Sequence, residues 1–595
     1  MLFQHHPLFA LFALLVSFFS IASAKTVVHD ETFIPDAVLR VTEADTTQAC
    51  LAAKPIVLVN GTSPGPALTL RAGEVYWIRV YNDMHNQNLT MHWHGLAMTT
   101  SPFSDGTPLA SQWPIPPQKF FDYELGIPTH SAGTYFYHSH VGMQAISATG
   151  PLIVEDKLKV PYYYDEERII LLQDVFAKDD LTLEKGLLAN PLVWSGESEM
   201  ILVNGKGAGT ANGKVCNGTL ASLDVQPGKT YRLRFIGGTA LTFASLAIEG
   251  HDLTIIEVDG AYTQPYNTSF LQLGSGQRYS VLLTTKSAPE KSAYYMQIES
   301  RDRPTLTRSF AVLNYGVPSP PTIFYPPPSP PITLPDTEVA FLDYDLAPHP
   351  DHEHLRMPCA SEVTRTITMV IHQRYDGVVT WVQNSFPWQE TFPKEPYLVS
   401  LYNGDVSNFP SMERALANGG IDPVTRTFPA QIGEVLEIII QNTGSDNNTV
   451  DSHPYHAHGG HFWDLGMGDG AYDQAANEAK WAAAAARGAS PIRRDTSMVR
   501  RYSNRAPKDS PAGWRAWRLR VTQPGVWMLH CHILPHMVMG MQTVWVHGNR
   551  SEVLRDVQDP DVQGYLKYGG DVLGDRNSWP SVVEFQSGKT WTDGQ

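Results

Sequence analysis

The chain has 595 residues, a formal net charge of −16, 46 glycines and 44 prolines. This length predicts two to four domains rather than a single core, and the many turn-forming residues favour β structure. The negative charge argues against a nucleic-acid partner or an anionic membrane surface, because both would require a basic footprint.

An apolar run near the start, LFALLVSFFSIASA, ends in the small residues Ala22, Ser23 and Ala24. It is too short for a stable membrane span, and its position predicts a secretory signal peptide over residues 1–24. We therefore expect a secreted protein, extracellular or in the cell wall, with no membrane span. Its Asn-x-Ser/Thr sequons are then candidates for N-glycosylation: Asn60, Asn88, Asn217, Asn267, Asn447 and Asn549.

Four cysteines in an exported protein would ordinarily form two disulfides. Cys531, however, stands directly between two histidines, which is an unusual place for a structural bridge. If Cys531 has another role, at least one of Cys50, Cys216 and Cys359 is unpaired.

Three segments share one pattern: AGEVYWIRVYND (72–83), PGKTYRLRFIGG (227–238) and IGEVLEIIIQNT (432–443). Each has a turn glycine, a charged residue and a strand of alternating apolar and polar residues. The repetition predicts three copies of one β domain. We place the copies at residues 25–160, 161–335 and 336–595, with the Pro-rich stretch 317–335 as a semi-rigid linker before the third.

Two stretches of the third copy depart from the strand pattern. The Ala-rich AYDQAANEAKWAAAAARG (471–488) predicts one helix, ended by Gly488. The Arg-rich IRRDTSMVRRYSNR (492–505) alternates and contains β-branched residues, which predicts a strand with solvated arginines rather than a site for an acidic partner.

Four His-x-His pairs occur, two in the first copy and two in the third, whereas the stretch after the repeated strand of the second copy has none. Alternate residues of a strand point to the same face, so each pair directs two imidazoles to one point. One pair alone is often incidental, but eight imidazoles that converge between two domains would hold three metal ions. The pairs are His92/His94, His138/His140, His456/His458 and His530/His532.

A second metal site is indicated by HCHILPHMVMGM (530–541). Cys531, His536 and Met541, with His453 from the stretch before the third pair, provide two imidazoles, a thiolate and a weak axial thioether. This set favours copper in a blue-copper electron-transfer centre. Zinc is the competing metal, but Met is a poor zinc ligand. Because both neighbours of Cys531 belong to the His-x-His pairs, an electron entering at the thiolate has a short through-bond path to the predicted cluster.

The motifs HWHG, HSH, HPYHAHG and HCHILPHMVMGM, in this order, resemble those of the multicopper oxidases. The likeness to three-domain laccases and ascorbate oxidases covers essentially the whole chain after the signal peptide, and all twelve ligand positions are filled. It implies an all-β chain of three cupredoxin-like Greek-key β-barrels and four copper ions. The implied ligands are His453, Cys531, His536 and axial Met541 for type 1, His92 and His456 for type 2, and His140, His458, His530 and His94, His138, His532 for the type 3 pair.

The resemblance also implies an activity, in which four one-electron oxidations of a small reducing organic substrate are coupled to reduction of O₂ to two waters. Asp105 matches a family carboxylate near type 2 copper that assists proton delivery, and a turn-forming Asp-Gly is the alternative. Some members carry a second acid just after the HCH motif. Leu534 and Pro535 stand there, which leaves the second proton donor unassigned.

Within the family the chain is most similar to the fungal-type branch of the ascorbate oxidases, through segments such as LVWSGESEMILVNGKG (192–207). In the plant enzymes two tryptophans flank the type 1 histidine. Trp194 matches the first and Trp381 the second, so both are candidates, with His536, for a pocket that stacks a planar reductant. Core packing is the alternative role for each tryptophan.

The same likeness bears on the cysteines. Cys50 and Cys216 match a disulfide that links the first two domains of the plant enzymes. Trp113 stands where those enzymes have a cysteine of a second interdomain bridge, so Cys359 has no evident partner.

Three functions are compatible with these residues. A laccase-like oxidase that couples phenols, such as polyketide precursors of pigments or secondary metabolites, is favoured by the branch resemblance. L-Ascorbate oxidation is favoured by the paired tryptophans. A non-catalytic extracellular copper protein is disfavoured by the complete ligand set. A ferroxidase would need carboxylates around His536, and none is adjacent to it in the sequence.

Overall fold

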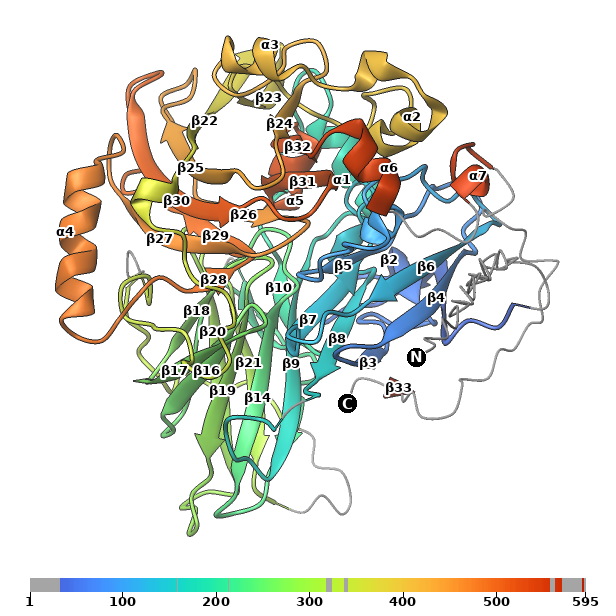
Figure 1. The fold of residues 1–595 in the computed structure, drawn as a ribbon. Helices are drawn as coiled ribbons and strands as arrows, with labels where there is room; N and C mark the ends of the chain where they lie inside the picture. The colour runs from blue at the N-terminus through green and yellow to red at the C-terminus, as the bar shows by residue number, and fades with distance from the viewer. Residues whose placement is uncertain are drawn as a thin grey trace, which may run out of the picture.

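The computed structural model describes residues 33–157, 159–211, 213–316, 324–336, 341–556, 562–569 and 591–592. The predicted signal peptide lies outside these residues. The described strands form six sheets, which pack as three two-sheet sandwiches; the third lies above the first two in the view of Figure 1. No described helix is long and apolar enough to cross a membrane.

The first sandwich has sheets of order β2-β1-β4-β6 and β33-β3-β8-β7-β5, which share one hydrophobic core. β1 alternates between buried and half-buried residues, as expected for a strand with one face in a core. The strands are β1 (Ala37–Thr46), β2 (Lys54–Val59), β3 (Ala67–Arg71), β4 (Val75–Asn82), β5 (His92–His94), β6 (Phe120–Gly126), β7 (Gly133–His138), β8 (Thr149–Glu155) and β33 (Trp591–Thr592), with the short helices η1 (Pro102–Asp105) and η2 (Gln144–Ile146).

The second sandwich has sheets of order β10-β9-β14-β19-β16-β17 and β12-β11-β21-β20-β15-β18, with β13 beside β21. Its elements are β9 (Glu166–Val175), α1 (Asp180–Leu187), β10 (Met200–Val203), β11 (Gly209–Ala211), β12 (Lys214–Cys216), β13 (Ala221–Asp224), β14 (Thr230–Gly237), β15 (Phe243–Ile248), β16 (Leu253–Val258), β17 (Ala261–Thr268), β18 (Leu271–Leu273), β19 (Arg278–Thr284), β20 (Ala293–Arg301) and β21 (Arg308–Asn314).

The third sandwich has sheets of order β23-β22-β25-β30-β27-β28 and β24-β32-β31-β26-β29. Its strands are β22 (Arg365–Asp376), β23 (Val378–Gln383), β24 (Thr427–Ala430), β25 (Val435–Thr443), β26 (His453–Ala457), β27 (Phe462–Gly468), β28 (Arg493–Arg494), β29 (Thr496–Val499), β30 (Pro511–Arg520), β31 (Gly525–Cys531) and β32 (Gln542–His547). Its helices are η3 (Ala360–Glu362), α2 (Tyr397–Asn403), η4 (Val406–Asn408), α3 (Met412–Leu416), α4 (Gln474–Ala485) and α5 (Leu534–Val538), followed by α6 (Arg550–Asp556) and α7 (Val562–Tyr565).

The repeat seen in the sequence corresponds to a repeat of topology. The three similar segments form β4, β14 and β25, and each pairs in parallel with the first strand of its sandwich, namely β1, β9 and β22. Each of these first strands pairs antiparallel with the next strand in the chain, β2, β10 and β23. The three segments therefore occupy one position in three copies of the same fold.

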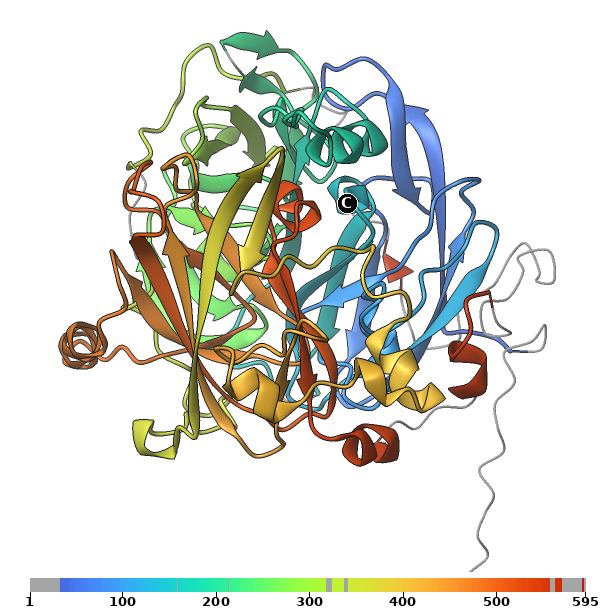
Figure 2. The ribbon, with the colours of Figure 1, turned by 90° about the horizontal axis from the view of Figure 1, so that it is seen from above.

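The predicted helix of the third copy is confirmed as α4, which projects from the edge of the molecule (Figure 2). The side chain of Asp473 accepts a hydrogen bond from the Ala476 amide at 2.9 Å and so caps the first turn. Gly488 follows the helix with φ of 91°, a left-handed conformation that glycine adopts without a steric penalty.

The prediction of solvated arginines over residues 492–505 is wrong for the arginines that face the second sandwich. Arg494 and Arg500 are only 4% and 3% exposed. Arg494 pairs with Asp259 at 2.9 Å, and Arg500 pairs with Asp302 at 3.2 Å. Their partners belong to another sandwich, so the local strand pattern contains no information about this burial.

The six sequon asparagines are all exposed, so their positions leave room for glycans, whose presence stays a prediction.

The disulfide between Cys50 and Cys216 is confirmed, with a Cα–Cα distance of 5.6 Å, and it joins the first sandwich to the second. Cys359 is free and exposed, and Cys531 is free and buried.

Removing the disulfide is expected to destabilise the protein. The double variant Cys50→Ala/Cys216→Ala should lose about 2–5 kcal/mol of unfolding free energy, because the cross-link closes a long loop in the unfolded chain. Urea unfolding followed by tryptophan fluorescence measures the change. Cys359→Ser, at an exposed free thiol, is the control and should unfold like the wild type; a double variant that does the same would contradict the prediction.

Two half-buried carboxyl groups lie close together where residues of all three sandwiches meet. Glu184 lies on α1, Glu390 lies before α2, and both approach Gly142 of the first sandwich. The Gly142 amide donates to Glu390 Oε2 at 3.1 Å. Desolvation, and then the neighbouring Glu184 charge, raise the pKa of Glu390 to about 8.

This raised pKa predicts a pH-dependent stability. Between the ordinary value of 4.5 and about 8, the folded protein keeps a proton that the unfolded chain releases, so stability falls as the pH rises through this range. Glu390→Gln should therefore be more stable than the wild type at pH 8, by up to about 5 kcal/mol at 1.36 kcal/mol per pKa unit, and similar to it near pH 4. Thermal unfolding at both pH values tests this, with exposed Glu413→Gln as the control. An equal gain at both pH values would refute the pKa argument.

Candidate metal centre

The eight histidines of the four His-x-His pairs lie together between the first and third sandwiches. β5 pairs with β7 so that His92 is opposite His138, and β26 pairs with β31 so that His456 is opposite His530. None of the eight residues is more than 6% exposed. The period of the strand thus aims each pair at one face, and the strand pairing brings the pairs together.

The ring nitrogens of this cluster fall into three groups. Facing nitrogens are 3.3 and 3.1 Å apart from His530 to His140 and His458, 3.2 Å apart from His94 to His532, and 3.4 Å apart from His92 to His456. His138 completes the second set, with its ligand nitrogen within 4.8 Å of those of His94 and His532. Two nitrogens bound about 2.0–2.1 Å from one ion at a tetrahedral angle lie about 3.3 Å apart, so each set fits a metal ion. These sets coincide with the type 3 and type 2 sets that the resemblance implied, and the assignment of metals to them stays a prediction.

The remaining nitrogen of most rings is hydrogen-bonded to a group that fixes its tautomer. Nδ1 donates to a backbone carbonyl in His92 (Asp105, 2.6 Å), His138 (Ser139, 2.8 Å), His456 (Asp495, 3.0 Å) and His530 (Cys531, 3.0 Å). Each of these rings therefore directs an Nε2 lone pair into the cluster. His138 Nε2 is buried and has no hydrogen-bond partner among the described residues, an unfavourable state that a bound metal would relieve.

The buried environment keeps seven of these imidazoles neutral. Desolvation, together with neighbouring histidines in most cases, lowers the pKa of His138 to about 4 and of His140 to about 3. The same causes hold the pKa well below the ordinary range in His92, His94, His458, His530 and His532. A neutral imidazole is the form that binds a metal, so the electrostatics of the cluster fit this use.

A second group consists of His453 on β26, Cys531 at the end of β31 and His536 on α5. The two Nδ1 atoms are 3.2 Å apart, and Cys531 Sγ lies 3.7 and 3.8 Å from them. Met541 is fully buried, and its backbone bonds both to Cys531 and to His536. Desolvation holds the pKa of the Cys531 thiol well above its ordinary value, so a soft cation is required to stabilise the thiolate here. The donor set fits copper.

Asp105 ends η1 directly beside the histidine cluster. Its Oδ2 lies 2.9 Å from His458 Nδ1, and its carbonyl accepts from His92, so one residue contacts two of the three sets. It is fully buried, and desolvation raises its pKa to about 8. The carboxyl group therefore holds a proton near neutral pH at the edge of the cluster.

The two tryptophans singled out in the sequence are placed differently. Trp381, on β23, packs against His453 and His536 with ring centroids 4.8 Å away in both cases, and only 4% of it is exposed. Trp194 is half-buried, with the guanidinium of Arg303 5.9 Å from its ring centroid. Trp194 thus has a partly exposed aromatic ring, whereas Trp381 is buried and packs against the two imidazoles.

Sequence reasoning missed Asp451. Its Oδ2 lies 3.5 Å from His536 Nε2, the nitrogen that does not face Cys531, and 24% of its side chain is exposed. Arg303 pairs both with Asp451, at 3.5 Å, and with Glu197, at 2.7 Å. A carboxylate is thus present at His536, although not next to it in the sequence. The position of Asp451 two residues before His453, which enters the same site, is the signal that would have found it.

The fold and the donor sets together define a copper-dependent oxidoreductase. Three profiles described as multicopper oxidase match residues 40–159, 166–318 and 390–551. The chain belongs to the multicopper oxidase family, whose members are copper enzymes of three cupredoxin-like domains that use O₂, so the fold class and the enzyme class expected above are confirmed.

Particular relatives refine this placement. The chain is 45% identical to Laccase-like multicopper oxidase 1 of Thermothelomyces thermophilus, with 96% of each chain covered. It is 32% identical to the L-ascorbate oxidase of Cucumis sativus, over 82% of this chain and 85% of that one. Among solved structures, Fet3p, described as a multicopper oxidase that functions in iron import, superposes with a TM-score of 0.69 at 25% identity, over 91% of this chain and 94% of that one.

Proposed function

We propose that the protein is a secreted, laccase-like multicopper oxidase that couples four one-electron oxidations of a phenolic substrate to reduction of O₂ to two waters. The observation that carries the proposal is the covalent link between the two metal groups. Cys531 belongs to the mononuclear group, and its neighbours His530 and His532 belong to two different sets of the cluster. When bound, one type 1, one type 2 and a type 3 pair of copper ions would supply the electron transfer and the O₂ chemistry.

Residues of the chain account for electron entry, electron transfer to the cluster and proton supply. His536 presents its Nε2 toward Asp451 at the half-exposed edge, where a substrate would deliver an electron. The chain from Cys531 into the flanking histidines connects this edge to the cluster through bonds. Asp105 holds a proton next to His458, where O₂ reduction consumes protons.

A phenolic substrate is favoured by the laccase-like relative at 45% identity, and the carboxylate at His536 is compatible with it. A phenol loses a proton when it loses an electron, and Asp451 is placed to accept that proton. L-Ascorbate is the alternative substrate, favoured by the ascorbate oxidase relative and by the packing of Trp381 against His536.

Oxygen uptake by the full-length, copper-loaded protein tests the proposal. We expect kcat/KM to be higher for phenols and naphthols, including polyketide pigment precursors, than for ascorbate. A preference for ascorbate by orders of magnitude would replace the substrate class, and no uptake with either reductant would reject both. Recovery of active protein from the culture medium with its N-terminus near residue 25 would support secretion.

Asp451→Asn gives a sharper test of the phenol assignment. The amide keeps the shape of the side chain but cannot accept a proton, so kcat/KM for phenols should fall by about 10²-fold or more. Ferrocyanide, which gives up an electron without a proton, should be oxidised at a nearly unchanged rate and is the matched control. An equal loss with both donors would show that Asp451 acts only on the structure of the site.

A further inference from the structure

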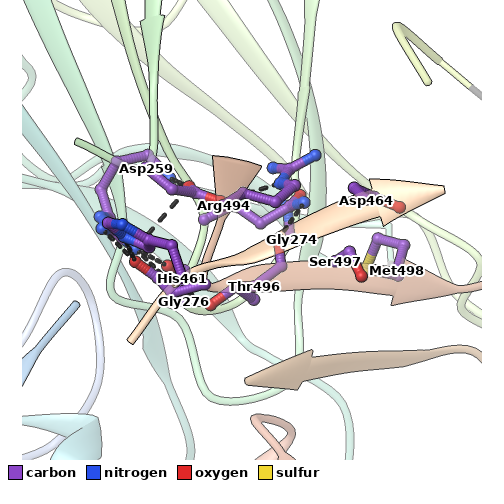
Figure 3. Close-up of polar contacts among 12 residues, drawn as sticks. Asp259, Gly274, Gly276, His461, Asp464, Arg494, Thr496, Ser497 and Met498 are labelled. Atoms are coloured by element: carbon purple, nitrogen blue, oxygen red, sulfur yellow. Dashed lines mark hydrogen bonds and ion pairs between the residues drawn. The ribbon is translucent and has the colours of Figure 1, made fainter. Parts of the chain in front are cut away.

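The second sandwich supplies no histidine to the cluster, yet its segment 274–278 lies directly against the ligands. Ser275 Oγ is 2.8 Å from His532 Nδ1. A β-carbon at Gly276, where φ is 85°, would lie 3.0 Å from His94 Cε1 and 3.1 Å from His532 Cδ2. Figure 3 shows Gly274 and Gly276 beside Arg494, Thr496 and His461 of the third sandwich. The segment approaches closely enough to affect how the imidazoles are held.

Arg278, at the end of this segment, is joined to Asp495 of the third sandwich by a bidentate ion pair. The two N···O distances are 2.7 and 2.6 Å, and the residues are 0% and 1% exposed. Arg278 Nε also donates to the carbonyl of Thr134 in the first sandwich at 3.0 Å. One guanidinium of the ligand-free domain therefore binds both ligand-bearing domains.

Asp495 in turn contacts two ligand histidines from different sandwiches. Its Oδ1 lies 3.3 Å from His94 Nε2 and 3.4 Å from His456 Nδ1. The hydroxyl of Thr496 lies 3.2 and 3.1 Å from the same two nitrogens. His456 Nδ1 also donates to the backbone carbonyl of Asp495 at 3.0 Å. Because both nitrogens are engaged on the outer side, His94 Nδ1 and His456 Nε2 are left to face the cluster, as their distances to His532 and His92 show. This explains why His94 faces its neighbour with Nδ1 whereas the other rings use Nε2.

The surroundings leave little room for another arrangement. A β-carbon at Gly95, where φ is 89°, would lie 2.5 Å from Arg278 Nη2 and 2.7 Å from Asp495 Oδ2, so only glycine fits next to His94. His461 Nε2 lies 3.0 Å from the second carboxylate oxygen of Asp495. Both oxygens of the carboxylate are therefore held, and the guanidinium balances its buried charge.

We propose that Arg278 and Asp495 are positioning residues that orient His94 and His456, so that the second domain sets the geometry of a cluster to which it gives no ligand. The proposal rests on the copper assignment made above. An ion pair with a purely structural role would lower only the stability when it is weakened. A positioning pair would, in addition, change the affinity and the spectrum of the metal that its histidines bind.

Arg278→Lys in the full-length protein tests this, because lysine keeps the charge but loses the bidentate geometry. The matched control is Arg515→Lys. Arg515 is also buried, and its guanidinium pairs with Asp343 and Asp464 rather than with the clustered histidines. Copper content per chain, competition with a chelator, the type 2 electron paramagnetic resonance signal, the visible type 1 absorption and the unfolding temperature are measured for both.

We expect Arg278→Lys to weaken copper binding at the cluster by about 10- to 100-fold and to change the type 2 signal, with the type 1 absorption retained. Arg515→Lys should lower only the unfolding temperature. Asp495→Asn should reproduce the spectral change, since it also weakens the pair with Arg278. Unchanged copper affinity and signal in Arg278→Lys would overturn the inference. A wild-type protein that binds no copper at the cluster would instead overturn the proposed function.

Discussion

Cys531→Ser should lose the blue colour of the type 1 centre and consume O₂ no faster than the copper-free protein, with every reductant. The thiolate is the soft ligand of the mononuclear group, lying 3.7 and 3.8 Å from the nitrogens of His453 and His536. It is also the first atom of the through-bond path into the cluster. A serine oxygen is a harder and less basic donor at neutral pH, so both the site and the path are lost.

Visible absorption, copper content and oxygen uptake measure this effect together. The variant should lose one copper per chain and keep those of the histidine cluster, because that cluster has its own ligands. Cys359→Ser is the matched control, since that thiol is free and exposed, and it should keep both colour and activity. A blue or active Cys531→Ser protein would contradict the assignment of the mononuclear site.

Asp105→Asn is expected to slow the O₂-reducing half of the reaction by about 10²-fold or more, the usual size of a lost general acid. The amide preserves the volume and can still accept the hydrogen bond from His458 Nδ1, so the ligand should stay in place. What it cannot do is hold and release the proton that the raised pKa of Asp105 keeps near the cluster.

Stopped-flow measurements separate the two halves of the reaction. Anaerobic bleaching of the blue colour by substrate should proceed at the wild-type rate in Asp105→Asn, whereas reoxidation by O₂ should be slow and should show an altered solvent deuterium effect. Normal reoxidation would show that Asp105 only orients His458. Slow bleaching would mean that the substitution disturbs the mononuclear site as well.

The sequence by itself determined those features that depend on near neighbours in the chain. The strand period of two makes each His-x-His pair point one way, wherever the strand lies, so His92 and His94 were recognisable as joint ligands without a fold. The same holds for Cys531 between His530 and His532, for the Ala-rich helix predicted within residues 471–488 and for the threefold repetition of β4, β14 and β25.

Only the tertiary structure decided which groups meet across domains. Asp495 lies in a stretch whose sequence has the pattern of an ordinary strand. Its role follows from contacts with Arg278 of the second sandwich, His94 of the first and His456 of its own sandwich. Asp451 and Arg303 likewise converge on His536 from different domains. Desolvation has the same origin: the pKa of Asp105 and the burial of Arg494 depend on what packs over them, a long-range property that local sequence patterns do not encode.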